Sequence, residues 1–289
     1  MEFIMQRNDY PALYKAADAA SAASQNTFLN SIRAEYCLLI LAAMLSMNLS
    51  NHVAYNVLTA LIFFALLGFV LFRALKSIDR TWYHGRAVAE SIKTLTWRYM
   101  MRAKPFEEGA DEEFANLLRA LIDSNKEYGA IIAGHVVNDD EITPFMRSVR
   151  AMDLQSRFAF YQKSRVDEQR TWYIDKARAN KKNFRRFIIL LGLIYLAAAC
   201  SSLMKIGYPD FQFYPTDVMI AIAGALIGWI QIKKFSELSA AYGLTGHEIG
   251  LIKASGADLQ SEEKFSEHVN DAEMAFSREH TQWIARQAG

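Results

Sequence analysis

The six histidines and the two cysteines are the side chains of this sequence that are best suited to catalysis or metal binding. No histidine stands at a metal-ligand spacing from another histidine or from a cysteine, and Cys37 and Cys200 both lie within apolar runs. The sequence also contains no GxxxxGK(S/T), GxGxxG, GxSxG or HExxH motif. We therefore expect no catalytic residue, no cofactor and no metal site, and the protein is predicted not to be an enzyme.

Two stripes that combine charged residues with tryptophan are the strongest candidates for a functional surface. The first follows i, i+4, i+7 and i+11 spacing, which places its members on one helix face: Arg86, Glu90, Lys93 and Trp97. The second has a similar spacing: Arg165, Gln169, Trp172, Lys176 and Asn180. Helix–helix packing with paired charges and buried arginine stems explains such a face. The alternative is a surface for a ligand or partner, because arginine and tryptophan are enriched at interaction hot spots.

Four apolar segments lie next to these stripes, at about 34–51, 53–72, 187–204 and 218–232. Apart from Glu35, near the start of the first, they contain no charged residue. With their flanks, they approach the ~20 residues that a helix needs to span a bilayer. If all four were buried in a soluble core, a chain of 289 residues would have too little polar surface to cover them. The composition, 52% hydrophobic with 22% charged, fits separate apolar and charged regions. The sequence therefore predicts an all-α integral membrane protein with four transmembrane helices in two hairpins.

Basic residues lie near the ends of the apolar segments that are opposite the hairpin loops: Arg33, Arg73, Lys76, Arg80, Lys181, Lys182, Arg185, Arg186, Lys233 and Lys234. The first hairpin loop, 50–56, has no basic residue, and the second has only Lys205. The positive-inside rule then places both termini and the central segment in the cytoplasm. The net charge of +1 gives no basic field for nucleic acid, which is not expected as a partner.

Long helical stretches are predicted outside the membrane, over 73–101, 143–186, 233–254 and 261–287. At ~1.5 Å per residue, the second of these would extend roughly 65 Å as one straight helix. Residues 104–140 are interrupted by proline and glycines, so the domain boundary is placed there, with one unit at 1–140 and a second at 141–289. Gln25-Asn-Thr-Phe28 and Gln169-Arg-Thr-Trp172, each ahead of a hairpin, suggest duplication.

Small residues are the notable feature inside the membrane segments. Gly224 and Gly228 form a GxxxG pattern, which lets helix backbones approach closely, either within one hairpin or between subunits. No Asp, Glu, Lys or Arg lies in the middle of an apolar segment, which argues against an ion-coupled transporter.

Three stretches of the sequence carry a resemblance to a known family. They read Arg86-x3-Glu90-Ser-x-Lys93-Thr94-x2-Trp97-Arg98-Tyr99 followed by Pro105-Phe106, then Tyr161-x3-Arg165-x3-Gln169-x2-Trp172-Tyr173-x2-Lys176-x3-Asn180, and near the end Glu279-His280-x2-Trp283. In these stretches the chain resembles a tandem SLATT protein. SLATT domains are prokaryotic two-transmembrane effector modules with long flanking helices.

The resemblance implies a role in nucleotide-linked bacterial conflict systems, where such modules are inferred to perforate the membrane and halt the infected cell. It implies an antiviral, abortive-infection effector in the bacterial inner membrane that forms homo-oligomers in the lipid bilayer. A cyclic nucleotide or a nucleotide-signalling protein is the partner that this reading implies. The alternative hypothesis is a membrane-anchored scaffold or sensor that recruits a cytoplasmic partner through its helical stalk.

Overall fold

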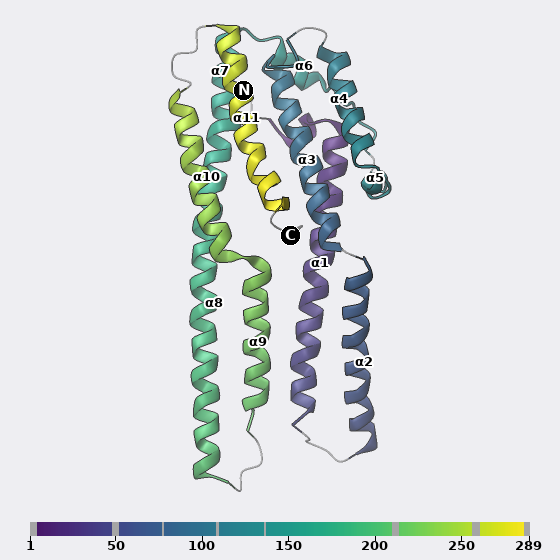
Figure 1. The fold of residues 1–289 in the computed structure, drawn as a ribbon, viewed down its shortest axis with the longest axis vertical. Helices are drawn as coiled ribbons and strands as arrows, with labels where there is room; N and C mark the ends of the chain where they lie inside the picture. Colours follow the sequence, from purple (N-terminus) through teal and green to yellow (C-terminus); the bar gives the residue numbers. More distant parts are fainter. Residues whose placement is uncertain are drawn as a thin grey trace. The chain divides into compact units, whose positions relative to one another are not determined.

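The computed structural model describes residues 5–47, 52–76, 78–107, 110–135, 137–209, 214–255 and 261–285, and these residues contain helices but no strand (Figure 1). The prediction of an all-α protein is confirmed. The helices are α1 (Ala12–Leu45), α2 (Val53–Lys76), α3 (Ile78–Met100), α4 (Ala110–Ser124), α5 (Lys126–Ala133), α6 (Pro144–Arg150), α7 (Leu154–Tyr161), the π-helix η2 (Gln162–Asp167), α8 (Glu168–Gly207), α9 (Thr216–Lys233), α10 (Phe235–Ser255) and α11 (Glu262–Ala285), preceded by the short 3-10 helix η1 (Arg7–Asp9).

The chain forms two compact units, and each combines segments from both halves of the sequence. The helical unit comprises Met1–Asn26, Ile78–Ile174 and Leu244–Gly289. The hairpin unit comprises Thr27–Ser77 and Asp175–Gly243. The helices α1 and α8 contribute residues to both units without a break in the helix.

The hairpin unit contains the apolar parts of α1, α2, α8 and α9. The described residues include four helices that are long and apolar enough to cross a membrane, which confirms the four predicted segments. Large apolar side chains such as Phe64, Leu193 and Leu196 point outward and are 59 to 70% exposed. A helix that shows such side chains on its outside is suited to lipid, because its backbone hydrogen bonds are satisfied within the helix. Residues 48–51 at the first hairpin loop and residues 210–213 at the second lie outside the described residues.

The two glycines of the GxxxG pattern have different surroundings within the hairpin unit. A Cβ at Gly228 would lie 2.1 Å from Oη and 2.9 Å from Cζ of Tyr36, so any larger residue at this position in α9 would require the Tyr36 side chain of α1 to move. A Cβ at Gly224 would meet no described atom within 4 Å. Gly228 therefore lies at a contact between the two hairpins of one chain, and Gly224 lies outside that contact.

In the helical unit, α3 packs against α4, α5, α6 and α11. The apolar residues of α11 recur at helical spacing, and all of those at this face are buried: Phe265, Val269, Ala272 and Phe276. Figure 1 shows α11 alongside α3. This packing brings the last helix of the chain against a helix that lies more than 150 residues earlier.

The helix predicted over 143–186 is interrupted once, between α6 and α7, and from Leu154 it continues through η2 and α8 to Gly207. The side chain of Thr143 caps the start of α6, and a carboxylate oxygen of Asp153 accepts a 3.0 Å hydrogen bond from the Ser156 amide at the start of α7. Each of these residues begins a helix because its side chain satisfies a backbone N–H group of the first turn. The stretch predicted from Lys233 is also interrupted, since Lys234 has a φ of 46° between α9 and α10.

Candidate functional site

The centre of the helical unit holds a buried ion pair between Arg165 in η2 and Glu273 in α11. Arg165 Nε donates to Glu273 Oε1 over 2.8 Å, and Arg165 Nη2 donates to Oε2 over 2.6 Å. Both side chains are at most 2% exposed. The two parallel charge-assisted hydrogen bonds hold α11 against η2.

Two further helices donate to the same carboxylate. The hydroxyl of Tyr161 in α7 donates to Glu273 Oε1 over 3.0 Å, and Thr94 Oγ1 in α3 donates to Oε2 over 3.1 Å. Glu273 therefore accepts hydrogen bonds from α3, α7 and η2. We call Thr94, Tyr161, Arg165 and Glu273 the Glu273 network.

Burial and the charges of the Arg165–Glu273 pair shift the pKa values of side chains in this network. Burial disfavours the charged form of Arg165, but the Glu273 carboxylate outweighs it, so the pKa of Arg165 is raised. Burial, with the Glu273 charge next, raises the pKa of Tyr161 well above its usual value. The tyrosine thus stays a neutral donor and the arginine stays a cation throughout the physiological range.

Aromatic rings enclose the guanidinium of Arg165. Its Cζ lies 5.8 Å from the ring centroid of Trp97 and 4.9 Å from that of Phe276, distances at which a cation is attracted to a ring face. Trp97 is 1% exposed, and its Nε1 donates to the hydroxyl of Tyr10 over 3.1 Å. The structure thus brings together Trp97 of the first predicted stripe and Arg165 of the second.

The rest of the first stripe lies on the same helix, further from this network. Arg86 Nη2 is 2.6 Å from Glu90 Oε1, and its Nη1 is 3.6 Å from a carboxylate oxygen of Asp18 in α1. Burial lowers the pKa of Lys93, although the neighbouring Glu90 charge favours its protonated form. These contacts match the interpretation of the stripe as a helix-packing face with paired charges.

The residues of the second stripe lie in different surroundings. Gln169 is partly exposed on α8, and Trp172 is 37% exposed and packs edge-on against Tyr173. Lys176 and Asn180 belong to the hairpin unit, where Asn180 Nδ2 donates to the carbonyl of Lys176. The π-helix η2 contains Arg165, and its wider turn changes the angle between residues that an α-helical spacing would align.

A second buried arginine ties the start of α11 to the unit. Arg157 is fully buried, and it donates to the carbonyls of Met101 and Met152 and to Glu262 Oε1 at the first turn of α11. Ser266 Oγ accepts from the Lys104 amide over 3.1 Å. The helix α11 is therefore attached at its N-terminal end as well as at Glu273.

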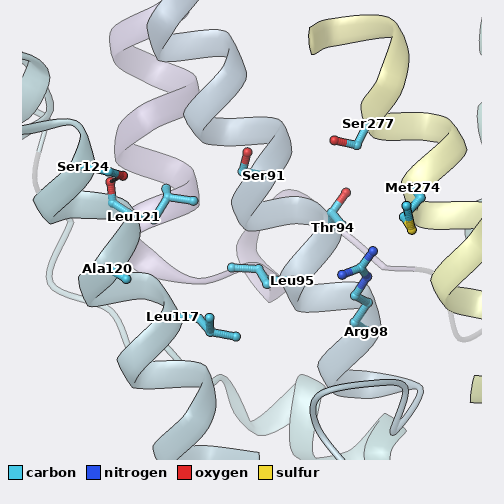
Figure 2. Close-up of a pocket in the computed structure, with 10 residues that line it drawn as sticks. All are labelled: Ser91, Thr94, Leu95, Arg98, Leu117, Ala120, Leu121, Ser124, Met274 and Ser277. Atoms are coloured by element: carbon cyan, nitrogen blue, oxygen red, sulfur yellow. Dashed lines mark hydrogen bonds between the residues drawn. The ribbon is translucent and has the colours of Figure 1, made fainter.

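An open groove of about 750 Å³ borders the Glu273 network between α3, α4 and α11 (Figure 2). Its lining residues are Ser91, Thr94, Leu95 and Arg98 from α3, Leu117, Ala120, Leu121 and Ser124 from α4, and Met274 and Ser277 from α11. Thr94 also donates to Glu273, and Nε of Arg98 is buried without a hydrogen-bond partner among the described residues. A molecule in this groove would contact both α11 and a member of the network.

Sequence reasoning singled out Arg165 and Trp97 but missed Glu273 and Arg157. The available signal for Glu273 was its place on the apolar face of α11, between Val269 and Phe276, where a carboxylate requires a buried partner. The predicted contact residues Glu279, His280 and Trp283 lie in the last turns of α11, outside the residues whose side chains the structure describes. The described residues include no group of three or more metal-ligating side chains.

Comparison with protein families assigns both halves of the chain. Residues 11–158 match the model of SMODS and SLOG-associating 2TM effector domain 3, and residues 161–283 match that of SMODS and SLOG-associating 2TM effector domain 1. The chain belongs to the SLATT family. It is a tandem SLATT protein with a membrane effector role, as its resemblance implied. No curated protein and no solved structure matched the chain.

The matches also show how the site is shared between the two SLATT domains. Thr94, Trp97 and Arg157 belong to the first match, whereas Tyr161, Arg165 and Glu273 belong to the second. The helical unit of this tandem SLATT protein therefore contains an interface between its two domains, and Glu273 connects them.

Proposed function

We propose that this SLATT protein is the membrane effector of a bacterial anti-phage, abortive-infection system. In this proposal several copies assemble in the inner membrane, with both termini cytoplasmic, and they open a pore or disrupt the bilayer on a cytoplasmic signal. The protein performs no catalysis and requires no cofactor. The signal is a cyclic nucleotide or a nucleotide-signalling protein.

The Glu273 network is the observation that carries this proposal. Glu273 holds α11 to α3, α7 and η2, and α8 begins directly after η2 and continues to Gly207 in the hairpin unit. A change in η2 can therefore be transmitted along a continuous helix, because an α-helix is stiff over such a length. The groove beside Thr94 is the place where a ligand or partner would displace α11.

The proposal is tested by inducible expression in bacteria with a dye that reports membrane potential. Wild-type protein, triggered by its conflict system, is expected to depolarise the membrane. Glu273→Gln keeps the size of the side chain but weakens the ion pair, so it should change the threshold for depolarisation at equal membrane-fraction yield. Glu263→Gln, at an exposed position of the same helix, is the matched control and should behave as wild type.

A membrane-anchored scaffold is the second candidate function, and the exposed Trp172 on α8 favours it as a docking residue. The same experiment separates the two functions. Harmless accumulation in the membrane, with unchanged potential after triggering, would contradict the effector function and support the scaffold.

A further inference from the structure

Two cations from different hairpins meet at one tryptophan ring in the hairpin unit. The guanidinium carbon of Arg33 in α1 lies 5.2 Å from the ring centroid of Trp229 in α9. Nζ of Lys233, at the end of α9, lies 5.9 Å from the same centroid. Both positive charges are thus held against one indole, although they repel each other.

The repulsion at Lys233 is not relieved by a carboxylate among the described residues. The positive charges of Arg33 and, in α8, of Lys176 act on Lys233 more than any negative charge does. Arg33 Nη1 donates to the neutral amide of Asn30, so that contact does not neutralise its charge. The nearby Glu35 is engaged by Arg73 at 2.8 Å. The cluster of Arg33 and Lys233 at Trp229 therefore has an excess of positive charge.

The position of this cluster is set by the ends of the apolar segments. Arg33 directly precedes the apolar segment of α1, and Lys233 directly follows that of α9. One turn further into the apolar region, Tyr36 of α1 contacts Gly228 of α9, which keeps the two helices together at this level. Tryptophan with basic residues at the end of a spanning helix is typical of the level of lipid headgroups.

We propose that Arg33 and Lys233 form a binding site for the phosphate headgroup of an anionic phospholipid. A phosphate accepts hydrogen bonds from both cations at once and removes their mutual repulsion, which no described carboxylate does here. Because Arg33 belongs to one hairpin and Lys233 to the other, the bound lipid holds the two hairpins together. Free phosphate has the same headgroup chemistry, but exposed apolar side chains on these helices offer a surface for acyl chains.

A second basic surface on α8 supports the choice of a lipid. Four exposed residues lie at i, i+1, i+4 and i+5, which places them on one side of the helix immediately before its apolar segment: Lys181, Lys182, Arg185 and Arg186. A cluster of this kind beside a spanning helix attracts anionic lipids, with a contribution from each basic residue. This surface on α8 would raise the local concentration of the lipid that Arg33 and Lys233 bind.

The proposal is tested on the full-length protein in nonionic detergent by counting bound lipids with native mass spectrometry. Phosphatidylglycerol, phosphatidylcholine and soluble glycerol 3-phosphate are the three probes. Phosphatidylglycerol should bind more tightly than phosphatidylcholine, and glycerol 3-phosphate should not displace it at equal concentration. Each charge removed should weaken binding by about fivefold, so Arg33→Gln/Lys233→Gln should weaken it by about twenty-five-fold.

Two further variants make the result decisive. Arg33→Lys/Lys233→Arg keeps both charges and should bind phosphatidylglycerol within about threefold of wild type. Arg119→Gln/Lys264→Gln removes two charges at exposed positions of the helical unit and should bind as wild type. Equal binding by the Arg33/Lys233 glutamine variant and this control would overturn the site, as would equal binding of the two lipids. Displacement by glycerol 3-phosphate would overturn the assignment to lipid. None of these measurements depends on pore formation.

Discussion

In the helical unit, Arg165 and Glu273 are at most 2% exposed and are paired with each other, whereas in the hairpin unit Phe64 and Leu196 are 70% and 63% exposed. The helical unit places charges inside and pairs them with each other. The hairpin unit places apolar side chains outside and keeps charges at the ends of its helices. One chain thus folds for two solvents, since the helical unit buries its core against itself and the hairpin unit needs lipid to cover it.

The largest effect is expected at the centre of the helical unit, where Glu273→Ala leaves the buried guanidinium of Arg165 without its partner. Breaking a buried pair from one side costs on the order of 3–5 kcal/mol of stability. Thermal unfolding of the purified protein, followed by tryptophan fluorescence, should show a strongly lowered transition. The double variant Arg165→Met/Glu273→Leu should recover much of this loss, because no charge then remains unpaired. A double variant as unstable as Glu273→Ala would contradict the ion-pair explanation.

The next largest loss of stability is expected at Trp97 of the first stripe, and Trp172 of the second stripe should differ from it. Trp97 is 1% exposed, so Trp97→Ala leaves a cavity and should cost about 3–5 kcal/mol, at or slightly below the effect of Glu273→Ala. Trp172 is 37% exposed, and Trp172→Ala should change stability far less. Unfolding curves test this difference directly. If Trp172→Ala abolishes membrane depolarisation while leaving the unfolding transition intact, Trp172 is a contact residue rather than a packing residue.

The sequence was sufficient for the features that depend on local patterns. The apolar runs around Phe64 and Leu196 extend over consecutive residues, so their length alone predicted the four spanning helices. Trp97 and Arg165 were selected for the same reason, since the mixture of charge and tryptophan is visible within one helical face.

The features that depend on distant contacts were not accessible in this way. Glu273 is 108 residues from Arg165 and 179 residues from Thr94, and nothing in either local pattern specifies the pairing. The π-helix at Gln162–Asp167 was also missed, because hydrophobic periodicity assumes an α-helical turn. The breaks near Asp153 and Lys234 arise from capping and from a positive φ, which override the helical propensity of their neighbours.

In the hairpin unit, a smaller effect should separate the two glycines of the GxxxG pattern. Gly228→Leu places a side chain where Tyr36 already lies, and overpacking of this kind costs about 1–3 kcal/mol. Gly224→Leu meets no described atom within 4 Å of its Cβ and should leave the contact between the hairpins intact. Crosslinking between cysteines introduced into α1 and α9 measures this contact. Tyr36→Ala should rescue Gly228→Leu, and equal crosslinking in both leucine variants would show that Tyr36 does not determine the packing.

The smallest expected effect is a dependence of stability on pH in the helical unit. Burial lowers the pKa of His268 on α11, although the charge of Asp271 opposes the shift, and Gln162 Nε2 lies 3.3 Å from its Nε2. Because the folded pKa is below the unfolded value of about 6.5, the unfolded state binds more protons between the two values. The stabilisation is therefore complete above about pH 6.5 and is lost as the pH falls through the folded value. His268→Gln should remove this dependence, and the effect is expected to be small because the side chain is only partly buried. His247→Gln, at an exposed position of α10, is the control, and the comparison is made by unfolding between pH 5 and pH 8. A wild-type slope that persists in His268→Gln would assign the proton uptake to another group.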